Sequence, residues 1–103
     1  MDTSFQTVEI KADNIKTYNS FSPNGDGLND VFEIDYIADF KPNHVYIYNR
    51  YGQLLWDGKD YDNTSVVWNG TDKAGEKLPP ATYFYIIEVN GKKTEKHWVE
   101  LIR

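Results

Sequence analysis

The sequence predicts an all-β fold, namely an immunoglobulin-like antiparallel β-sandwich of about seven strands. Short apolar runs recur roughly every eight to fifteen residues and are separated by Gly, Pro, Asn and Asp, a rhythm typical of a sandwich or barrel. No segment of adequate length shows a helical period. The chain of 103 residues fits one domain, residues 1–103, and is long enough to bury a single core. It contains no cysteine, so this core forms without disulfides.

Eight apolar runs are candidates for strands. In chain order they cover residues 5–10, 16–21, 31–36, 44–48, 53–57, 65–68, 82–89 and 95–102. The tetrapeptide 49–52 predicts a hairpin turn in which Gly52 takes positive φ. The prolines of Leu78-Pro79-Pro80 donate no ladder hydrogen bonds, so this segment is expected to lead into the strand at Thr82. Asn90-Gly91 is the favoured pair of a type I′ turn and predicts that the last two strands form a long hairpin.

The last strand alternates between two faces. Val99 and Leu101 fall on one face, which we expect to be core, whereas Lys96, Trp98 and Glu100 fall on the other. Trp98 therefore either covers a neighbouring strand or stands as an exposed aromatic anchor for a partner.

The strand at 44–48 raises the same question. If Val45 and Ile47 are core, Tyr46 and Tyr48 line the outer face. Cross-strand aromatic pairing accounts for the two tyrosines, and a platform that stacks on sugar rings is the alternative. Trp56 and Trp68 are expected in the core.

The charge of the chain is uneven. The net charge is -5, and residues 1–40 hold eight acids against two bases, whereas residues 41–103 are nearly balanced. An acidic chain repels phosphate backbones, so nucleic acid is not an expected partner. No apolar run approaches the ~20 residues of a membrane span. No signal peptide is visible, and if the protein is exported we expect its signal upstream in a longer parent chain.

The segment PNGDGLND at residues 23–30 is the most informative stretch. Asn24, Asp26 and Asp30 place side-chain oxygens at close spacing on a loop that its glycines and proline allow to turn sharply. Converging oxygens of this kind suit Ca²⁺, so these three residues are candidate calcium ligands. The spacing is only part of an EF-hand loop, and no bidentate Glu follows. A plain Asx-turn that enters the next strand is the alternative.

Catalysis is not expected. There is no cysteine nucleophile, His44 and His97 lack metal-site spacing, and no Gly-x-Ser-x-Gly elbow is present. A second acidic group, Asp57, Asp60, Asp62 and Asp72, is expected to lie in loops and to cap turns. The alternative is that acids of residues 57–63 contribute ligands across space to a site begun by Asp26 and Asp30. We therefore predict a non-catalytic binding module without a small-molecule substrate.

Four segments, in order, resemble the gliding-motility-associated C-terminal domain. They are FSPNGDGLNDVF (21–32), VYIYNRYGQLLW (45–56), WNGT (68–71) followed by LPPATYFY (78–85), and WVELIR (98–103). The resemblance covers roughly residues 20–103. Ala81 departs from the family pattern, where a glycine is usual, and His97-Trp98 replaces a small-plus-aromatic pair.

The resemblance implies a role. Domains of this family end large surface or secreted proteins of the Bacteroidota, often gliding adhesins, and act as type B sorting signals of the type IX secretion system. The implied partner is the outer-membrane machinery, including a barrel-type membrane protein, and the implied route leads through the periplasm to the cell surface or the medium. We expect a monomer. A carbohydrate-binding module and a calcium-stiffened spacer of an adhesin are the alternatives.

The surface that a receptor would read is expected in two places. One is the loop at 23–30, and the other is the last hairpin, whose candidate partner-binding residues are Lys92, Lys93, Lys96, Trp98 and Arg103. Alternatively, the terminal strand pairs edge-on with a receptor strand.

Overall fold

A computed structural model describes residues 15–25 and 30–103, and these residues form seven strands and one short 3-10 helix. The strands are β2 (Lys16–Thr17), β3 (Ser20–Phe21), β4 (Ile34–Asp35), β5 (Asn43–Tyr48), β6 (Leu54–Lys59), β7 (Ala81–Val89) and β8 (Lys92–Leu101). The helix η2 (Ile37–Asp39) follows β4. None of the helices in this part of the chain is long and apolar enough to cross a membrane.

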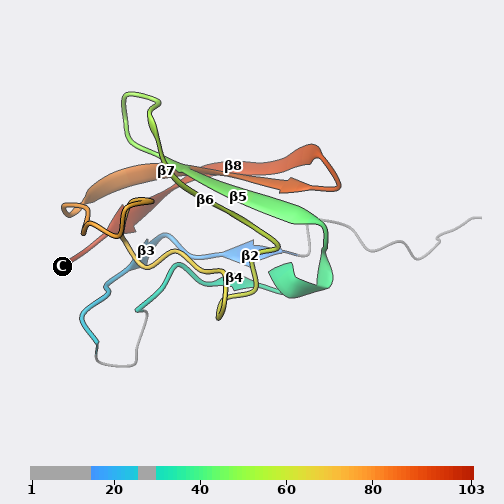
Figure 1. Cartoon of the computed structure of the whole chain (residues 1–103), viewed down its shortest axis with the longest axis horizontal. Coiled ribbons are helices and arrows are strands. Elements are labelled where there is room, and N and C mark those ends of the chain that lie inside the picture. Colours follow the sequence, from blue (N-terminus) through green and yellow to red (C-terminus); the bar gives the residue numbers. More distant parts are fainter. Residues whose placement is uncertain (1–14, 26–29) are drawn as a thin grey trace, which may run out of the picture.

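The strands form two sheets (Figure 1). The larger sheet has five strands in the order β3-β8-β7-β5-β6, and the smaller sheet pairs β2 with β4. All described pairs are antiparallel except that of β3 with the end of β8, which is parallel. The predicted all-β, immunoglobulin-like sandwich is confirmed.

The core lies between the two layers. The inward residues of the central strands β5, β7 and β8 alternate with outward ones, because successive side chains of a strand point to opposite faces. The fully or nearly fully buried side chains include Val45, Ile47, Tyr83, Tyr85, Ile87, Val99 and Leu101 from the large sheet and Phe32, Ile34, Ile37, Tyr61 and Trp68 from the opposite side. The predicted core faces of β5 and β8 are confirmed, as is the burial of Trp68, whereas Trp56 is only half-buried.

Trp68 lies at the centre of an aromatic cluster. Its ring meets those of Phe21, Phe32 and Tyr83 edge-on, with centroids 5.1, 6.3 and 5.7 Å apart. Edge-to-face geometry of this kind adds to the stability gained from burial alone. Large rings therefore build the core of a domain that has no disulfide.

Several predicted strands differ from the structure. The run at 65–68 is not a strand, and two of its N–H groups bond to side chains: Val66 N–H donates to Asp62 Oδ1 and Trp68 N–H donates to Tyr61 Oη. The run at 16–21 divides at Tyr18 and Asn19, where the chain passes from the small sheet to the large one.

The run at 31–36 keeps only the two residues of β4. The side-chain amide of Asn63 accepts from Ile34 N–H at 2.9 Å and donates to Ile34 O at 2.8 Å, so a side chain takes the place of a neighbouring strand. β6 extends the run at 53–57 to Lys59, and β8 begins three residues before the run at 95–102. The run at 5–10 lies outside the described residues.

Candidate recognition site

The β7–β8 hairpin presents four of the five residues that the sequence predicts to bind a partner. Both residues of its turn, Asn90–Gly91, have positive φ, as the predicted type I′ turn requires. Lys92 and Lys93 begin β8 directly after this turn and are exposed. Lys96 and Trp98 follow on the outer face of the same strand, also exposed. The hairpin therefore displays these four side chains on one strand, β8, which is paired with β7, instead of on a loop.

Arg103, the fifth candidate, makes contacts within the domain. Its Nε donates to Leu78 O and its Nη2 donates to Gly70 O, both at 2.8 Å. Gly70 has φ +89, and a Cβ there would lie 3.0 Å from Arg103 Nη2, so the guanidinium sits directly over this glycine. Arg103 holds the loop segments around residues 70 and 78 to the end of β8.

A row of apolar side chains crosses the outer face of the large sheet. The register pairs Leu54 with Tyr48, Tyr48 with Phe84, and Phe84 with Trp98, so one residue comes from each of β6, β5, β7 and β8. Leu54, Phe84 and Trp98 are 50, 41 and 38% exposed. We call these four residues the outer apolar row. Trp98 thus does both things that the sequence left open: it packs beside a neighbouring strand and remains exposed.

The turn at 49–52 converts part of this face into a groove. Gly52 has φ +81 and its N–H donates to Asn49 O at 3.0 Å, as the hairpin prediction requires. The β5–β6 connection rises from the sheet on the side away from the β2–β4 pair (Figure 1). A groove of about 730 Å³ is lined by Tyr48, Phe84, Ile86 and Trp98 from the sheet and by Arg50 and Gly52 from the turn.

The charged side chains that line the groove are cationic. Arg50 comes from the turn and Lys96 from β8, and the lining within the described residues contains no Asp or Glu. The guanidinium of Arg50 lies 5.0 Å from the ring centroid of Tyr51 and donates to its hydroxyl at 2.9 Å. Neither Arg50 nor Lys96 forms an ion pair in the part of the chain that the structure describes. The groove therefore combines aromatic rings with two cations that remain available.

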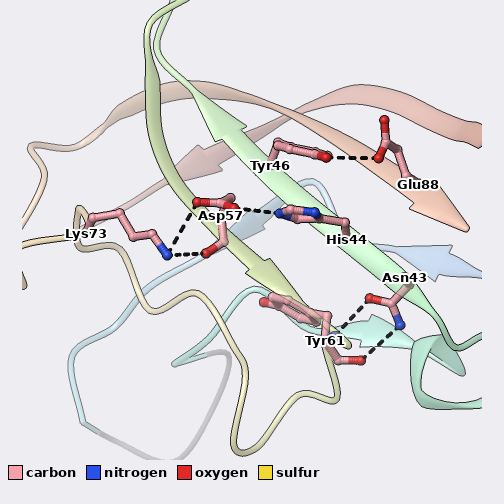
Figure 2. Close-up of polar contacts among 7 residues, drawn as sticks. All are labelled: Asn43, His44, Tyr46, Asp57, Tyr61, Lys73 and Glu88. Atoms are coloured by element: carbon pink, nitrogen blue, oxygen red, sulfur yellow. Dashed lines mark hydrogen bonds and ion pairs between the residues drawn. The ribbon is translucent and has the colours of Figure 1, made fainter. Parts of the chain in front are cut away.

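A polar cluster occupies the same face, beyond the apolar row (Figure 2). His44 Nε2 lies 2.6 Å from Asp57 Oδ2, and Lys73 Nζ donates to Asp57 O at 2.9 Å and lies 3.4 Å from its Oδ1. The hydrogen bond from His44, followed by that from Lys73, lowers the pKa of the Asp57 carboxyl. Asp57 lies in β6, so its predicted placement in a loop is wrong, because the strand continues to Lys59. Asp62 and Asp72 cap turns as predicted.

The tyrosine of this cluster is held by a neighbouring strand. Tyr46 Oη donates to Glu88 Oε1 at 2.9 Å, and its ring stacks on that of His44 with centroids 4.0 Å apart. Desolvation at this half-buried position and the hydrogen bond to Glu88 raise the pKa of Tyr46. His44 and Tyr46 are thus paired with the carboxylates of Asp57 and Glu88. Among the described residues, no Ser or Thr hydroxyl donates a hydrogen bond to His44. The cluster joins β5 to β6 and β7.

The loop at 23–30 is described only in part. Asp26, a candidate calcium ligand, lies outside the described residues. Of the other two candidates, Asp30 accepts a hydrogen bond from Gly25 N–H at 3.0 Å through its Oδ1, and Gly25 has φ +79. No group of three or more His, Cys, Asp or Glu side chains suited to a metal occurs within residues 15–25 and 30–103. The calcium assignment stays a prediction.

Sequence reasoning did not find the outer apolar row or Arg50. The alternation of β7, in which Phe84 and Ile86 share the face opposite to Tyr83 and Tyr85, was a usable signal. The register was not, because the pairing of Phe84 with Tyr48 depends on the sheet order, and that of Phe84 with Trp98 depends on a register shift between Ile87 and Glu88 in the last hairpin.

Comparison with known protein families identifies a match. The family model described as CHU_C Type IX secretion signal domain matches residues 15–101. No curated protein matches the chain.

Proposed function

The chain belongs to the family of type IX secretion signal domains, and we propose that it acts as a type B sorting signal of the gliding-associated kind. In this proposal it directs a large surface or secreted protein, such as an adhesin, through the periplasm and across the outer membrane. It is monomeric and non-catalytic, and its partner is the outer-membrane machinery with a barrel-type membrane protein. The observation that carries the proposal is the family membership, which spans nearly the whole described chain.

The fold supports a role in recognition. A receptor gains affinity from a surface that is already ordered, because no ordering entropy is lost when the complex forms. The outer apolar row and the cations Lys92, Lys93 and Lys96 lie on a hydrogen-bonded sheet whose inner side contributes Val45, Ile47, Val99 and Leu101 to the buried core. A rigid sheet face of this kind is suited to binding a second protein.

Export of a foreign reporter tests the proposal. Residues 1–103 are fused to the carboxyl end of a periplasmic fluorescent protein in a bacterium that has the machinery. The reporter should then appear at the cell surface or in the medium, and it should stay in the periplasm of strains that lack the machinery or its partner barrel. A fusion to an unrelated β-sandwich domain is the control. Retention of the wild-type fusion in the periplasm of the competent strain would overturn the proposal.

We also propose that the loop at 23–30 binds Ca²⁺ through Asn24, Asp26 and Asp30. The support is the spacing of oxygen donors and the glycine turn at Gly25, whose φ is +79. The hydrogen bond from Gly25 N–H to Asp30 Oδ1 brings the two ends of the loop together, as a ligand loop requires. This proposal is independent of the sorting role, and its test is given in the Discussion.

A further inference from the structure

The outer apolar row is an unusual surface for an acidic domain. Burying an aromatic side chain is favourable, yet Phe84 and Trp98 remain about two-fifths exposed beside each other in adjacent strands. Aromatic residues and arginine are enriched at protein interfaces and at the residues that dominate binding energy. Apolar side chains gathered on one face, instead of scattered singly, mark an interaction site.

The groove beside this row is shaped for a side chain of a partner. The lining includes Tyr48, Phe84 and Trp98 from the sheet, and Arg50 and Gly52 from the turn at 49–52, which rises from the sheet (Figure 1). A groove of about 730 Å³ has room for one or two large apolar side chains of an inserted segment. A flat membrane surface would meet this raised turn before it reached the sheet.

The charges of the groove indicate what kind of segment fits. The chain carries a net charge of -5, yet the charged groups that line the groove are Arg50 and Lys96. Within the described residues both lack an ion-pair partner, in contrast to Lys73, which lies 3.4 Å from Asp57 Oδ1. Cations in the lining of an apolar groove complement carboxylates that flank an apolar side chain.

We propose that this groove binds a short acidic peptide segment of the secretion machinery, whose apolar or aromatic side chain enters between Phe84, Trp98 and the turn. Carboxylates on either side of that side chain pair with Arg50 and Lys96. The inference rests on the proposed sorting function and names the chemistry of the partner at its surface. It places the recognition on the sheet face, not on the loop at 23–30.

Export of reporter fusions is the first test. Phe84→Ser and the double variant Arg50→Glu/Lys96→Glu should each lower export about tenfold or more. The matched controls are Tyr36→Asn, which removes an aromatic side chain that is 65% exposed elsewhere, and Lys41→Glu/Lys77→Glu, which makes the same change of charge outside the groove. Both controls should be exported like the wild type. Thermal melting of each purified variant establishes that it is folded.

The outcomes separate this inference from the sorting role. If the wild-type fusion is exported and the folded groove variants are exported equally well, the inference is wrong and the sorting function stands. If the wild-type fusion is not exported, the sorting function fails, and the binding experiment below decides on the groove alone.

Peptide binding to the isolated chain is the second test. The probe is a synthetic peptide with a central phenylalanine flanked by glutamates, and the control peptide carries lysines in their place. The glutamate peptide should shift the NMR resonances of the Tyr48 and Phe84 amides and the Trp98 indole, and these shifts should weaken with salt and vanish in Arg50→Glu/Lys96→Glu. Absence of these shifts, equal shifts with both peptides, or binding instead to maltooligosaccharides or to anionic phosphatidylglycerol vesicles would overturn the proposal.

Discussion

Tyr61 links two segments of the chain on the side of the core opposite the large sheet. It is fully buried, its Oη donates to Phe32 O at 2.6 Å, and it accepts from Trp68 N–H at 2.8 Å. Burial raises the pKa of this hydroxyl far above its usual value. One phenol thus provides partners for two backbone groups.

Tyr61→Phe should lower the free energy of unfolding by about 1–3 kcal/mol, because it leaves a buried N–H and a carbonyl without their partner. Urea denaturation at neutral pH measures this. Tyr51→Phe is the matched control, since Tyr51 is 77% exposed, and it should change the free energy by no more than about 0.5 kcal/mol. Equal stability of Tyr61→Phe and the wild type would contradict this account of the core.

Asp57 gives the domain a pH-dependent contact. Its pKa is lowered in the folded state, chiefly by the hydrogen bond from His44. A carboxyl with a depressed folded pKa stabilises the fold above its unfolded pKa of 3.8, and this contribution is lost as the pH falls through the folded pKa.

Asp57→Asn should therefore reduce the unfolding free energy by about 1 kcal/mol at neutral pH, a modest figure because the pair is partly exposed. The difference from the wild type should shrink as the pH falls below about 3.8. Urea denaturation across this pH range measures both effects. Asp39→Asn, at an exposed position, is the control. A difference that stays constant from neutral to strongly acidic pH would show that the carboxylate charge is not responsible.

At the scale of elements, the end of β8 is fixed by contacts beyond the ladder. β3 pairs with it at Glu100 and Leu101, and the guanidinium of Arg103 donates to the carbonyls of Leu78 and Gly70. These contacts join the end of the last strand to the connection between β6 and β7. The sequence analysis predicted that Arg103 binds a partner, whereas in the structure its guanidinium donates to two backbone carbonyls of the domain itself.

Arg103→Ala should lower the unfolding free energy by about 1–2 kcal/mol, because the carbonyls of Leu78 and Gly70 lose charge-assisted hydrogen bonds. Arg103→Lys should restore only part of this loss, since one ammonium cannot reproduce the fork of the guanidinium. Thermal melting and hydrogen exchange of the β8 amides are the measurements. Lys93→Ala, at the other end of β8, serves as the control. If the melting temperatures of all three variants equal that of the wild type, Arg103 has no stabilising role.

For the whole molecule, bound calcium would raise stability by an amount set by its concentration relative to its dissociation constant. If the loop at 23–30 binds Ca²⁺, a chelator should lower the melting temperature by several degrees, and millimolar Ca²⁺ should restore it. Asp26→Ala should abolish this dependence, and Asp39→Ala, an acid outside the loop, should keep it. Melting curves that coincide with and without chelator would show that the loop does not bind Ca²⁺, and the proposed sorting role would be unaffected.

The sequence by itself determined the class of fold, the positions of the long strands and the two glycine turns. These features depend on local chemistry: alternation defines the faces of β5, β7 and β8, and Gly52 and Asn90-Gly91 accept the positive φ that their turns need. The motifs also indicated a type IX secretion signal domain, which the family match confirms, whereas the gliding-associated type B subtype stays a proposal.

Only the tertiary structure decided which segments stop being strands and which side chains meet on the outer face. In residues 65–68 the N–H groups of Val66 and Trp68 bond to the side chains of Asp62 and Tyr61, and Ile34 of β4 bonds to the side chain of Asn63, which is 29 residues away in the chain. The outer apolar row likewise depends on the order in which the sheet places β6, β5, β7 and β8 side by side. Local sequence sets the preference of each segment, whereas contacts between distant segments set its partners, and the candidate recognition surface consists of such contacts.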